Sequence, residues 1–316
     1  MILTVTPNLC MDKTYKIPGF SIDAVNRPSL VHTMAGGKGI NTARAYRTLG
    51  GNAVVTGFEG GLTGATLLNA LRKEGIEAHC VKVPGETRTC IAVINPDDGT
   101  QTEINENGPQ IGTNNAQELL DQFKRLVSEY TFTTVALCGS LPPGSPVNLY
   151  AEMKEFAQLH NVRCALDTSG EPLRDGALSS PWLLKPNRKE AEYLLERELQ
   201  TDDDVVCAAR TLRSRYGCAY AMVSVGSRGA VLSCDRGDWI AIPPAIQFAS
   251  AVASGDTMLA GFLWSLQHGD GETRPESALR MAVGAGAANA MVVGAAICTK
   301  GSMLELADRV TLRQLR

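Results

Sequence analysis

Short apolar runs and helix-like patterns alternate along most of the chain. The runs are rich in β-branched residues and end at turn or polar residues, which predicts buried strands at 2–6, 53–57, 134–138, 163–166 and 219–225. Apolar residues recur at helical spacing in the segments 42–49, 65–74, 116–130, 147–160 and 276–293. Strands that alternate with helices are typical of βα units. We therefore predict one large α/β domain.

Two stretches interrupt this alternation. Residues 13–35 alternate loosely between apolar and polar positions without a helical pattern, and residues 89–94 and 101–104 flank a turn at 95–99. We predict that these segments lie outside the main sheet. Together they would form a small sheet that covers one face of a site.

A turn of small residues precedes an apolar helix near residue 256. Ala253, Ser254 and Gly255 have little side-chain bulk, so their N–H groups can approach an anion at a helix N-terminus. Asp256 follows in the first turn, where its oxygens could accept a proton from a bound hydroxyl. This combination suggests phosphoryl transfer. The alternative is that Asp256 only caps the helix.

A second glycine-rich stretch precedes the helix predicted at 42–49. Gly36, Gly37 and Gly39 permit close approach of the backbone to a ligand, while Lys38 and Asn41 supply a charge and an amide. The stretch matches neither the Walker A pattern nor the G-x-G-x-x-G dinucleotide fingerprint.

Polar residues follow several predicted strands at their carboxyl ends, where parallel sheets bind ligands. Asp12 and Ser140 are candidates of this kind, and residues 224–229 resemble a phosphate-facing turn. Asn187 and Glu190 are three residues apart at a predicted helix start, so they could hold the water shell of a metal. Equally, they could cap that helix.

Charge and cysteine content limit the classes of binding partner and the compartment that we expect for this chain. The 316 residues carry a net charge of −3, which gives no electrostatic footprint for nucleic acid or an anionic membrane, so an anionic substrate would need local cations. Nine cysteines without a C-x-x-C pair suggest free thiols in a reducing cytoplasm. The N-terminal segment indicates a first strand rather than a signal peptide, and no apolar run is long enough to span a bilayer.

The motifs in this order resemble the ribokinase-like, or PfkB, carbohydrate kinase family along the whole chain, and within it the branch of 1-phosphofructokinases and tagatose-6-phosphate kinases. The most specific matches are residues 36–41 and 253–256; supporting matches are 7–12, 26–27, 102–109, 138–144, 185–190 and 224–226. The resemblance implies a central, mostly parallel sheet flanked by helices. It also implies one domain over 1–316, with a small β-sheet lid from about 13–35 and 88–105.

The activity that the resemblance implies is ATP-dependent phosphorylation of a ketohexose monophosphate to the bisphosphate, with Asp256 as general base and the N–H groups of residues 253–255 around the transferring phosphoryl. 1-Phosphofructokinase is the first reading, beside tagatose-6-phosphate kinase and 6-phosphofructokinase. The implied sugar-phosphate ligands are Asp12, Arg27, Gly36, Gly37, Lys38, Asn41, Arg88, Glu103 and Ser140. The implied nucleotide ligands are Lys185, Asn187, Ser224, Gly226, Gly229 and Asn289, with Mg²⁺ held through water by Asn187 and Glu190.

Other readings stay open at this point. A kinase of an unphosphorylated sugar or nucleoside would leave the cations Arg27, Lys38 and Arg88 unpaired, and an inactive sugar-phosphate-binding regulator would not need Asp256 and Glu190. A dehydrogenase is opposed by the absent fingerprint. Exposed lid strands have unpaired edges, which suggests a homodimer through the lid.

Two positions depart from the family pattern. The family commonly has glycine where this chain has Ala253; a helical φ would tolerate the methyl group, whereas a positive φ would cost about 1–2 kcal/mol. Ser250 stands where ribokinases often have an aspartate linked to a monovalent cation, so potassium dependence is in doubt.

Overall fold

The computed structural model describes residues 1–315 and contains two sheets. The spatial order of the larger sheet is β15 (Thr311–Leu315), β14 (Gly237–Ile242), β13 (Ala230–Cys234), β12 (Tyr220–Ser224), β11 (Leu183–Leu184), β10 (Arg163–Asp167), β9 (Thr134–Cys138), β1 (Ile2–Thr6), β4 (Ala53–Glu59) and β5 (Glu77–Ala78), with β6 (Val81–Lys82) also on β4. From β12 to β5 all neighbouring strands pair parallel, and β12 to β15 pair antiparallel. The mostly parallel central sheet is confirmed.

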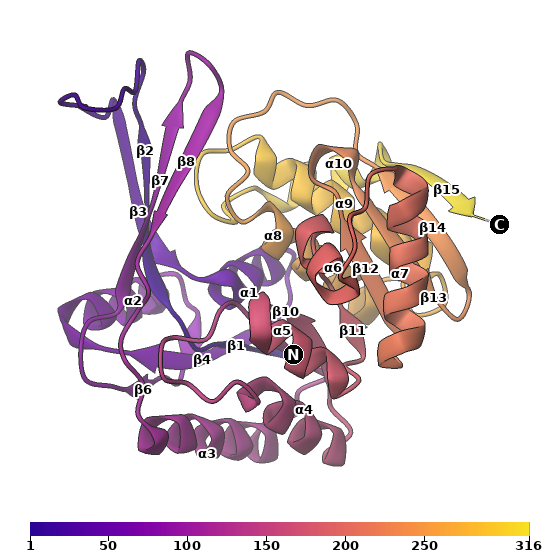
Figure 1. Cartoon of the computed structure of the whole chain (residues 1–316), viewed down its shortest axis with the longest axis horizontal. Helices are drawn as coiled ribbons and strands as arrows, with labels where there is room; N and C mark the ends of the chain where they lie inside the picture. The colour runs from indigo at the N-terminus through magenta and orange to yellow at the C-terminus, as the bar shows by residue number, and fades with distance from the viewer. Residues whose placement is uncertain (316) are drawn as a thin grey trace.

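Helices cover both faces of this sheet (Figure 1). Neighbouring strand residues point to opposite faces, so Ile2 and Val55 belong to one apolar core and Leu3 and Val54 to another. The first core is completed by α1 (Lys38–Thr48), α2 (Gly61–Lys73), α8 (Ser254–His268), α9 (Pro275–Ala290) and α10 (Lys300–Asp308). The second is completed by α3 (Thr113–Glu129), α4 (Leu149–Leu159), α5 (Gly170–Leu178), α6 (Arg188–Leu195) and α7 (Asp202–Tyr216). The fold is therefore a three-layer α/β/α sandwich, as expected.

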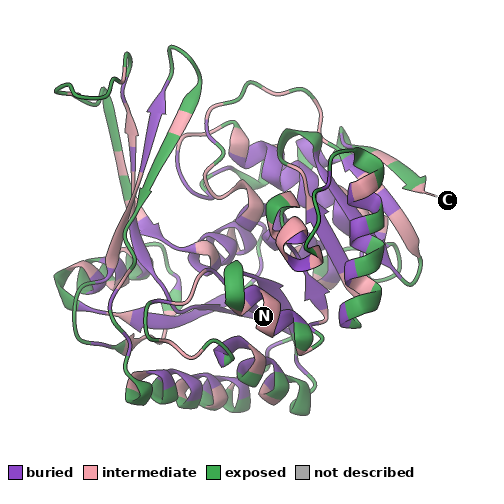
Figure 2. Ribbon diagram, in the orientation of Figure 1, coloured by how far each residue is buried: buried purple, intermediate pink, exposed green. Residues whose placement is uncertain are grey.

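The two irregular stretches form a separate small sheet that projects from the main body (Figure 1). Its order is β3 (Leu30–Gly36), β2 (Cys10–Lys16), β7 (Arg88–Asn95) and β8 (Thr100–Asn105), and β2 pairs with β7 in parallel. Its outer strands and the loops at its tip are largely exposed (Figure 2). The expectation of a small sheet outside the main one is confirmed, but β2 begins at Cys10. Asp12 therefore lies on a strand of the small sheet, not in a loop after β1.

Helix α1 begins at Lys38, four residues before the predicted start, and two glycines explain why. Gly37 is the N-cap residue and has a φ of 110°, a conformation that glycine adopts at low cost. A Cβ atom on Gly39 would lie 2.0 Å from Oγ1 of Thr6, so only glycine lets the first turn pack this closely against β1. The glycine-rich stretch thus brings Lys38 and Asn41 to the carboxyl end of β1.

Within residues 1–315, no helix combines the length and the apolar character needed to cross a membrane. All nine cysteines are free thiols.

Candidate active site

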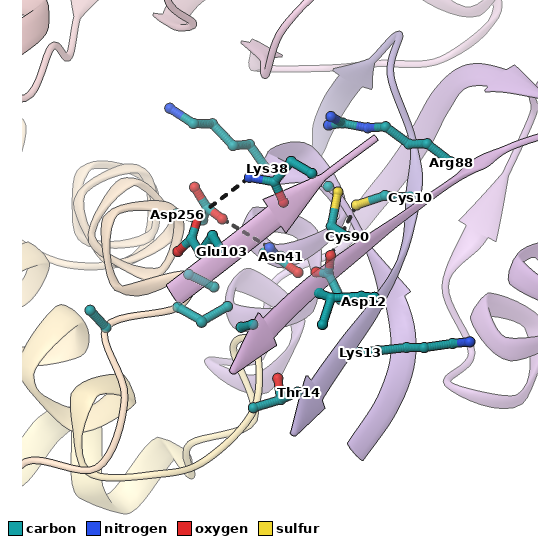
Figure 3. Close-up of a pocket in the computed structure, with 17 residues that line it drawn as sticks. Cys10, Asp12, Lys13, Thr14, Lys38, Asn41, Arg88, Cys90, Glu103 and Asp256 are labelled. Carbon is teal, nitrogen blue, oxygen red and sulfur yellow. Dashed lines mark hydrogen bonds between the residues drawn. The ribbon is translucent and has the colours of Figure 1, made fainter. Parts of the chain in front are cut away.

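Two cavities meet at the loop that precedes α8. The first, of about 280 Å³, lies between the small sheet and the starts of α1 and α8; we call it the small-sheet cavity (Figure 3). The second, of about 650 Å³, lies between the end of β12, residues 243–248 and the helices α8 and α9; we call it the helix cavity. Ala253 and Asp256 line the small-sheet cavity, Ser254 and Gly255 line the helix cavity, and Ala251 lines both. The predicted anion-binding residues 253–255 therefore lie at the boundary between the cavities. We call the turn of residues 251–255 the cradle.

Asp256 is buried at the floor of the small-sheet cavity. Nδ2 of Asn41 donates a hydrogen bond to its Oδ2 over 2.9 Å, which fixes the orientation of the carboxylate (Figure 3). Burial raises the pKa of Asp256 to about 6, against the opposing attraction of the Lys38 ammonium. A carboxylate with this pKa and a free face toward a cavity can take a proton from a ligand near neutral pH.

Two lysines share one buried carboxylate beside the cradle. Nζ of Lys38 lies 2.8 Å from Oδ1 of Asp167, and Nζ of Lys185 lies 2.7 Å from its Oδ2. A Cβ atom on Gly255 would lie 3.7 Å from the same Lys185 ammonium, so this charge stands directly beside the first turn of α8. The sequence analysis missed Asp167 as a site residue, although its position after the strand predicted at 163–166 was the same signal that singled out Asp12.

Asp167 and Lys38 hold each other ionised. Burial alone would raise the pKa of Asp167, but Lys185 and Lys38 outweigh it and leave that pKa lowered. Burial likewise works against the charge of Lys38, yet the carboxylates of Asp167, Glu190 and Asp256 leave its pKa above the ordinary value. Lys38 therefore remains a cation at the small-sheet cavity.

The small-sheet cavity brings together several of the predicted sugar-phosphate ligands. A Cβ atom on Gly36 would lie 2.0 Å from Oδ2 of Asp12, so glycine at this position makes room for the carboxylate. Arg88 donates to the main-chain carbonyls of Glu106 at 3.1 Å and Asn8 at 3.2 Å, which anchors its guanidinium at the cavity. The remaining predicted lining residues are Gly37, Lys38, Asn41 and the exposed Glu103.

Three predicted sugar-phosphate ligands do not line this cavity, and Gly36, which only makes room for the Asp12 carboxylate, is one of them. Arg27 is exposed in the loop between β2 and β3 and does not line the small-sheet cavity. Ser140 is also absent from that lining; its hydroxyl accepts a hydrogen bond from Nδ2 of Asn8 at 3.2 Å. Of the three cations expected around the phosphate, Arg88 and Lys38 thus line the cavity. Arg88 is held by main-chain carbonyls, whereas Lys38 is paired with the carboxylate of Asp167.

The cradle has a strained backbone. Ala253, the N-cap residue of α8, has a φ of 61°, so the glycine-like conformation is kept although the residue carries a methyl group. The N–H group of Ser254 donates to the carbonyl of Ala251 at 3.2 Å and is engaged in the turn itself. The donors that α8 can offer to a ligand are therefore those of Gly255 and Asp256 in its first turn.

Asn289, predicted as a nucleotide ligand, does not line the helix cavity and supports the loop before α8. The residue is fully buried on α9, and its Nδ2 donates to the carbonyl of Val252 at 2.6 Å and to Oγ of Ser254 at 3.1 Å. Its Oδ1 accepts from the N–H group of Ala296 at 2.8 Å. These three bonds hold the cradle in place.

The helix cavity is lined by four of the predicted nucleotide ligands, which are Asn187, Ser224, Gly226 and Gly229. Lys185 does not line it. The sequence analysis missed its apolar lining, formed by Pro243, Pro244, Ile246, Phe248, Met258 and Val283. A cavity with apolar walls and few polar groups suits a flat aromatic ring.

Asn187 and Glu190 form a capping box at the start of α6. The Asn187 side chain accepts from the N–H group of Glu190 at 3.0 Å, and Oε2 of Glu190 accepts from the N–H group of Asn187 at 2.8 Å. The helix-capping reading of this pair is therefore correct. The other carboxylate oxygen of Glu190, Oε1, lies 3.8 Å from the Lys38 ammonium and points toward the charged cluster.

Known carbohydrate kinases resemble this chain in sequence and in fold. The sequence model for pfkB family carbohydrate kinases matches residues 7–301. A 1-phosphofructokinase from Rhodobacter capsulatus is 36% identical over 262 residues, which are 83% of this chain and 82% of the relative. Phosphofructokinase-2 from Escherichia coli, solved in complex with substrates and products, matches with a TM-score of 0.89 at 28% identity over 98% of each chain. Its tetrameric inhibited form matches with a TM-score of 0.87 at 27% identity, again over 98% of each chain.

The family match covers nearly the whole chain, including the glycine-rich stretch before α1 and the start of α8. The chain accordingly belongs to the pfkB family of carbohydrate kinases and is a sugar-phosphate kinase, which transfers a phosphoryl group to an alcohol.

Proposed function

We propose that this enzyme transfers the terminal phosphoryl group of ATP to a free hydroxyl of a ketohexose monophosphate and releases the bisphosphate. The position of the cradle is the observation that supports this proposal. Residues 251–255 separate the two cavities, and Asp256 lies on the side of the small-sheet cavity. A donor in one cavity and an acceptor in the other would meet at the first turn of α8.

The acceptor would occupy the small-sheet cavity. Asp12 and Asn41 offer a carboxylate and an amide for sugar hydroxyls, and Arg88 offers a guanidinium, which binds phosphate through paired N–H groups. Fructose 1-phosphate is the preferred candidate because the relative from Rhodobacter capsulatus is a 1-phosphofructokinase. The small sheet would act as a lid that excludes water from this cavity.

Asp256 would serve as the general base. Its carboxylate is oriented by Asn41, and its pKa of about 6 leaves it ionised at neutral pH and able to take a proton. The N–H groups in the first turn of α8 and the ammonium of Lys185 would stabilise negative charge on the phosphoryl group in transit.

ATP would occupy the helix cavity, with its base between the apolar walls and its phosphates toward Gly255. The residues present fit a Mg²⁺ ion held through water, because Oε1 of Glu190 is turned away from the capping box toward the charged cluster. Bound there, Mg²⁺ would neutralise phosphate charge. Asn187 has its side-chain oxygen engaged in the capping box, so Glu190 would carry most of this role.

We further propose a homodimer through the small sheet. Its edges β3 and β8 leave backbone groups unpaired within the chain, and exposed apolar side chains lie on or beside it, namely Ile22, Val25, Leu30, Val31 and Ile104. The related phosphofructokinase-2 forms a tetramer in its inhibited form.

The test is release of ADP from Mg-ATP with fructose 1-phosphate, fructose 6-phosphate, tagatose 6-phosphate, fructose, ribose and adenosine as acceptors. Turnover on one phosphorylated ketose is expected. Asp256→Asn should keep binding of both substrates and lower turnover about 10²–10⁴-fold, the range for loss of a general base. Turnover only on a neutral sugar or a nucleoside would refute the acceptor assignment, and near-native turnover of Asp256→Asn would refute the base.

A further inference from the structure

A pair of thiols lies in the small-sheet cavity and has no part in the proposed reaction. Strands β2 and β7 pair in parallel with Cys10 opposite Arg88 and Asp12 opposite Cys90. Because residues two apart on a strand share a face, this register places all four side chains on the same side of the small sheet. Figure 3 shows the two sulfur atoms next to each other, with the Asp12 carboxylate beside them.

The three possible donor atoms are close enough to share one ion. Sγ of Cys10 donates to Oδ1 of Asp12 over 3.0 Å, and the two sulfurs and a carboxylate oxygen all lie within 4.8 Å of one another. Zinc binds thiolate sulfur at about 2.3 Å, so two sulfurs on a tetrahedral zinc ion stand about 3.8 Å apart. Small side-chain rotations would bring all three atoms to such an ion. Within residues 1–315 this is the one such group of three metal-binding side chains that comes together.

The donor set determines which metal fits. Two sulfurs and one carboxylate oxygen suit a borderline-soft ion such as Zn²⁺, whereas Mg²⁺ requires oxygen ligands in an octahedron. A site with three protein ligands leaves the fourth tetrahedral position open to water or to a ligand hydroxyl. Two thiolates and a carboxylate carry three negative charges, one more than the two positive charges of Zn²⁺ neutralise. The guanidinium of Arg88 on the same face would balance the remaining negative charge.

We propose that Cys10, Asp12 and Cys90 form a binding site for Zn²⁺ in the small-sheet cavity, and that Zn²⁺ bound there competes with the sugar phosphate. On binding, each of the two thiols releases its proton to solvent, and the hydrogen bond from Cys10 to Asp12 is replaced by two bonds to the metal. Competition follows because Zn²⁺ would engage Asp12, a residue assigned to the sugar. This second part rests on the proposed function, whereas the binding site does not.

Direct binding is tested on the tag-free native chain with Zn²⁺ and with Co²⁺ as its coloured substitute. Equilibrium dialysis should give one Zn²⁺ per chain, and Co²⁺ should produce the near-ultraviolet sulfur-to-metal charge-transfer band of thiolate ligation. Cys10→Ser and Cys90→Ser should each weaken that band and bind Zn²⁺ at least about tenfold more weakly, since even outer partners of a metal site change affinity about 10–100-fold. Cys207→Ser, which removes an exposed thiol on α7, is the matched control and should behave like the native chain.

Competition is tested by adding Zn²⁺ at fixed Mg-ATP and raising the concentration of the sugar phosphate. The apparent KM for the sugar phosphate should increase with Zn²⁺ while kcat is unchanged, and Cys90→Ser should lose this effect relative to its own rate without Zn²⁺. Circular dichroism checks that each variant is folded.

The outcomes separate the two parts. Equal Zn²⁺ binding by the native chain and by folded Cys10→Ser and Cys90→Ser would overturn the site. Binding with the charge-transfer band but inhibition that higher sugar phosphate does not relieve would overturn the competition. If no sugar phosphate is turned over even without Zn²⁺, the proposed function fails while the binding result stands by itself.

Discussion

At the scale of single residues, the burial of Asp256 sets the pH range in which it can accept a proton. Burial of the carboxylate disfavours its charged form and raises its pKa, while the positive charge of Lys38 lowers that pKa in part. The resulting pKa of Asp256 is about 6. A base must be deprotonated before it acts. Its ionised fraction therefore rises as the pH rises through this value and is nearly complete one to two pH units above it.

We expect kcat to increase with pH through an inflection near pH 6 and to level off above it. Initial rates between mildly acidic and mildly alkaline pH, with both substrates saturating, measure this profile. The residual activity of Asp256→Asn should lack the inflection. A native profile that falls as pH rises through 6 would contradict the assignment of Asp256 as the base.

The strained residue Ala253 leads to a second prediction at this scale. Its φ of 61° costs a non-glycine residue about 1–2 kcal/mol, whereas the extra freedom of glycine in the unfolded chain costs about 0.4–1 kcal/mol. Ala253→Gly should therefore raise the free energy of unfolding by up to about 1 kcal/mol. Turnover should stay close to that of the native chain, because the methyl group is not a hydrogen-bond donor.

The comparison for this change is Ala296→Gly, since Ala296 has a φ of 58° and lies outside the cradle. Its methyl group is fully buried, so denaturant unfolding should show less stabilisation in Ala296→Gly than in Ala253→Gly. A lower stability of Ala253→Gly beside a higher one of Ala296→Gly would show that the methyl group of Ala253 makes a packing contact worth more than its strain.

At the scale of elements, α6 and α7 begin with the same device at different distances from the site. Asn187 with Glu190 caps α6, and Thr201 with Asp204 caps α7 by the same reciprocal pair of hydrogen bonds. Asn187 lines the helix cavity and Thr201 does not. Comparison of the two caps therefore separates capping from any part in nucleotide binding.

Asn187→Ala and Thr201→Ala should each lower the free energy of unfolding by about 1 kcal/mol, the usual cost of losing an N-cap side chain. Asn187→Ala should in addition raise the KM for Mg-ATP, whereas Thr201→Ala should leave it unchanged. Denaturant unfolding and steady-state kinetics measure both. If the KM for Mg-ATP is unaffected in both variants, Asn187 is a capping residue only.

The sequence predicts an element well where neighbouring residues along the chain determine it, and poorly where contacts with distant residues do. The strand at 134–138 was predicted with its observed bounds, because a short apolar run between polar residues needs no tertiary information. Helix α5 was not predicted, since Gly170, Pro172 and Gly176 weaken its helical pattern. The start of α1 was placed too late because the close packing of Gly39 against Thr6 is a tertiary contact.

At the site, too, features set by the local sequence were predicted and features set by distant contacts were not. Stretches of glycine and other small residues identified Asn41, Asp256 and the cradle as lining residues, because the backbone requirement is visible in the residue types. Asp12 was expected in a loop after β1 and lines the cavity from β2 instead. Asp167 carried the strand-end signal, but its sharing by two lysines was not visible in the sequence. The hydrogen bonds of Asn289 beneath the loop were not visible either, because both arrangements depend on burial and on partners far away in the chain.

At the scale of the whole molecule, the small sheet is the part most exposed to a partner. Ile22 and Val25 near its tip are 91% and 82% exposed, and with Leu30, Val31 and Ile104 they gather exposed apolar side chains on this one part of the chain. A second copy of the chain that pairs through this sheet would cover them.

We expect the native chain to sediment as a dimer at micromolar concentration and Val25→Lys to shift it toward the monomer, because a charge buried in the interface would lose its hydration. Leu159→Lys is the control, since Leu159 is 81% exposed at the end of α4, away from the small sheet. Sedimentation velocity measures both. A monomeric native chain, or equal dissociation of both variants, would contradict a dimer through the small sheet.

The positions of the two cavities along the chain have a further consequence. The small-sheet cavity takes its lining from residues 10–105 and from 251–256, whereas the helix cavity takes its lining from residues 187–290. On the proposed function, acceptor and donor are thus recognised by different halves of one polypeptide, joined only at the cradle. Acceptor preference can then diverge by changes in the N-terminal half while the donor half is left intact. A chimera that joins the first 105 residues of a relative with another acceptor to the rest of this chain should inherit the acceptor of that relative.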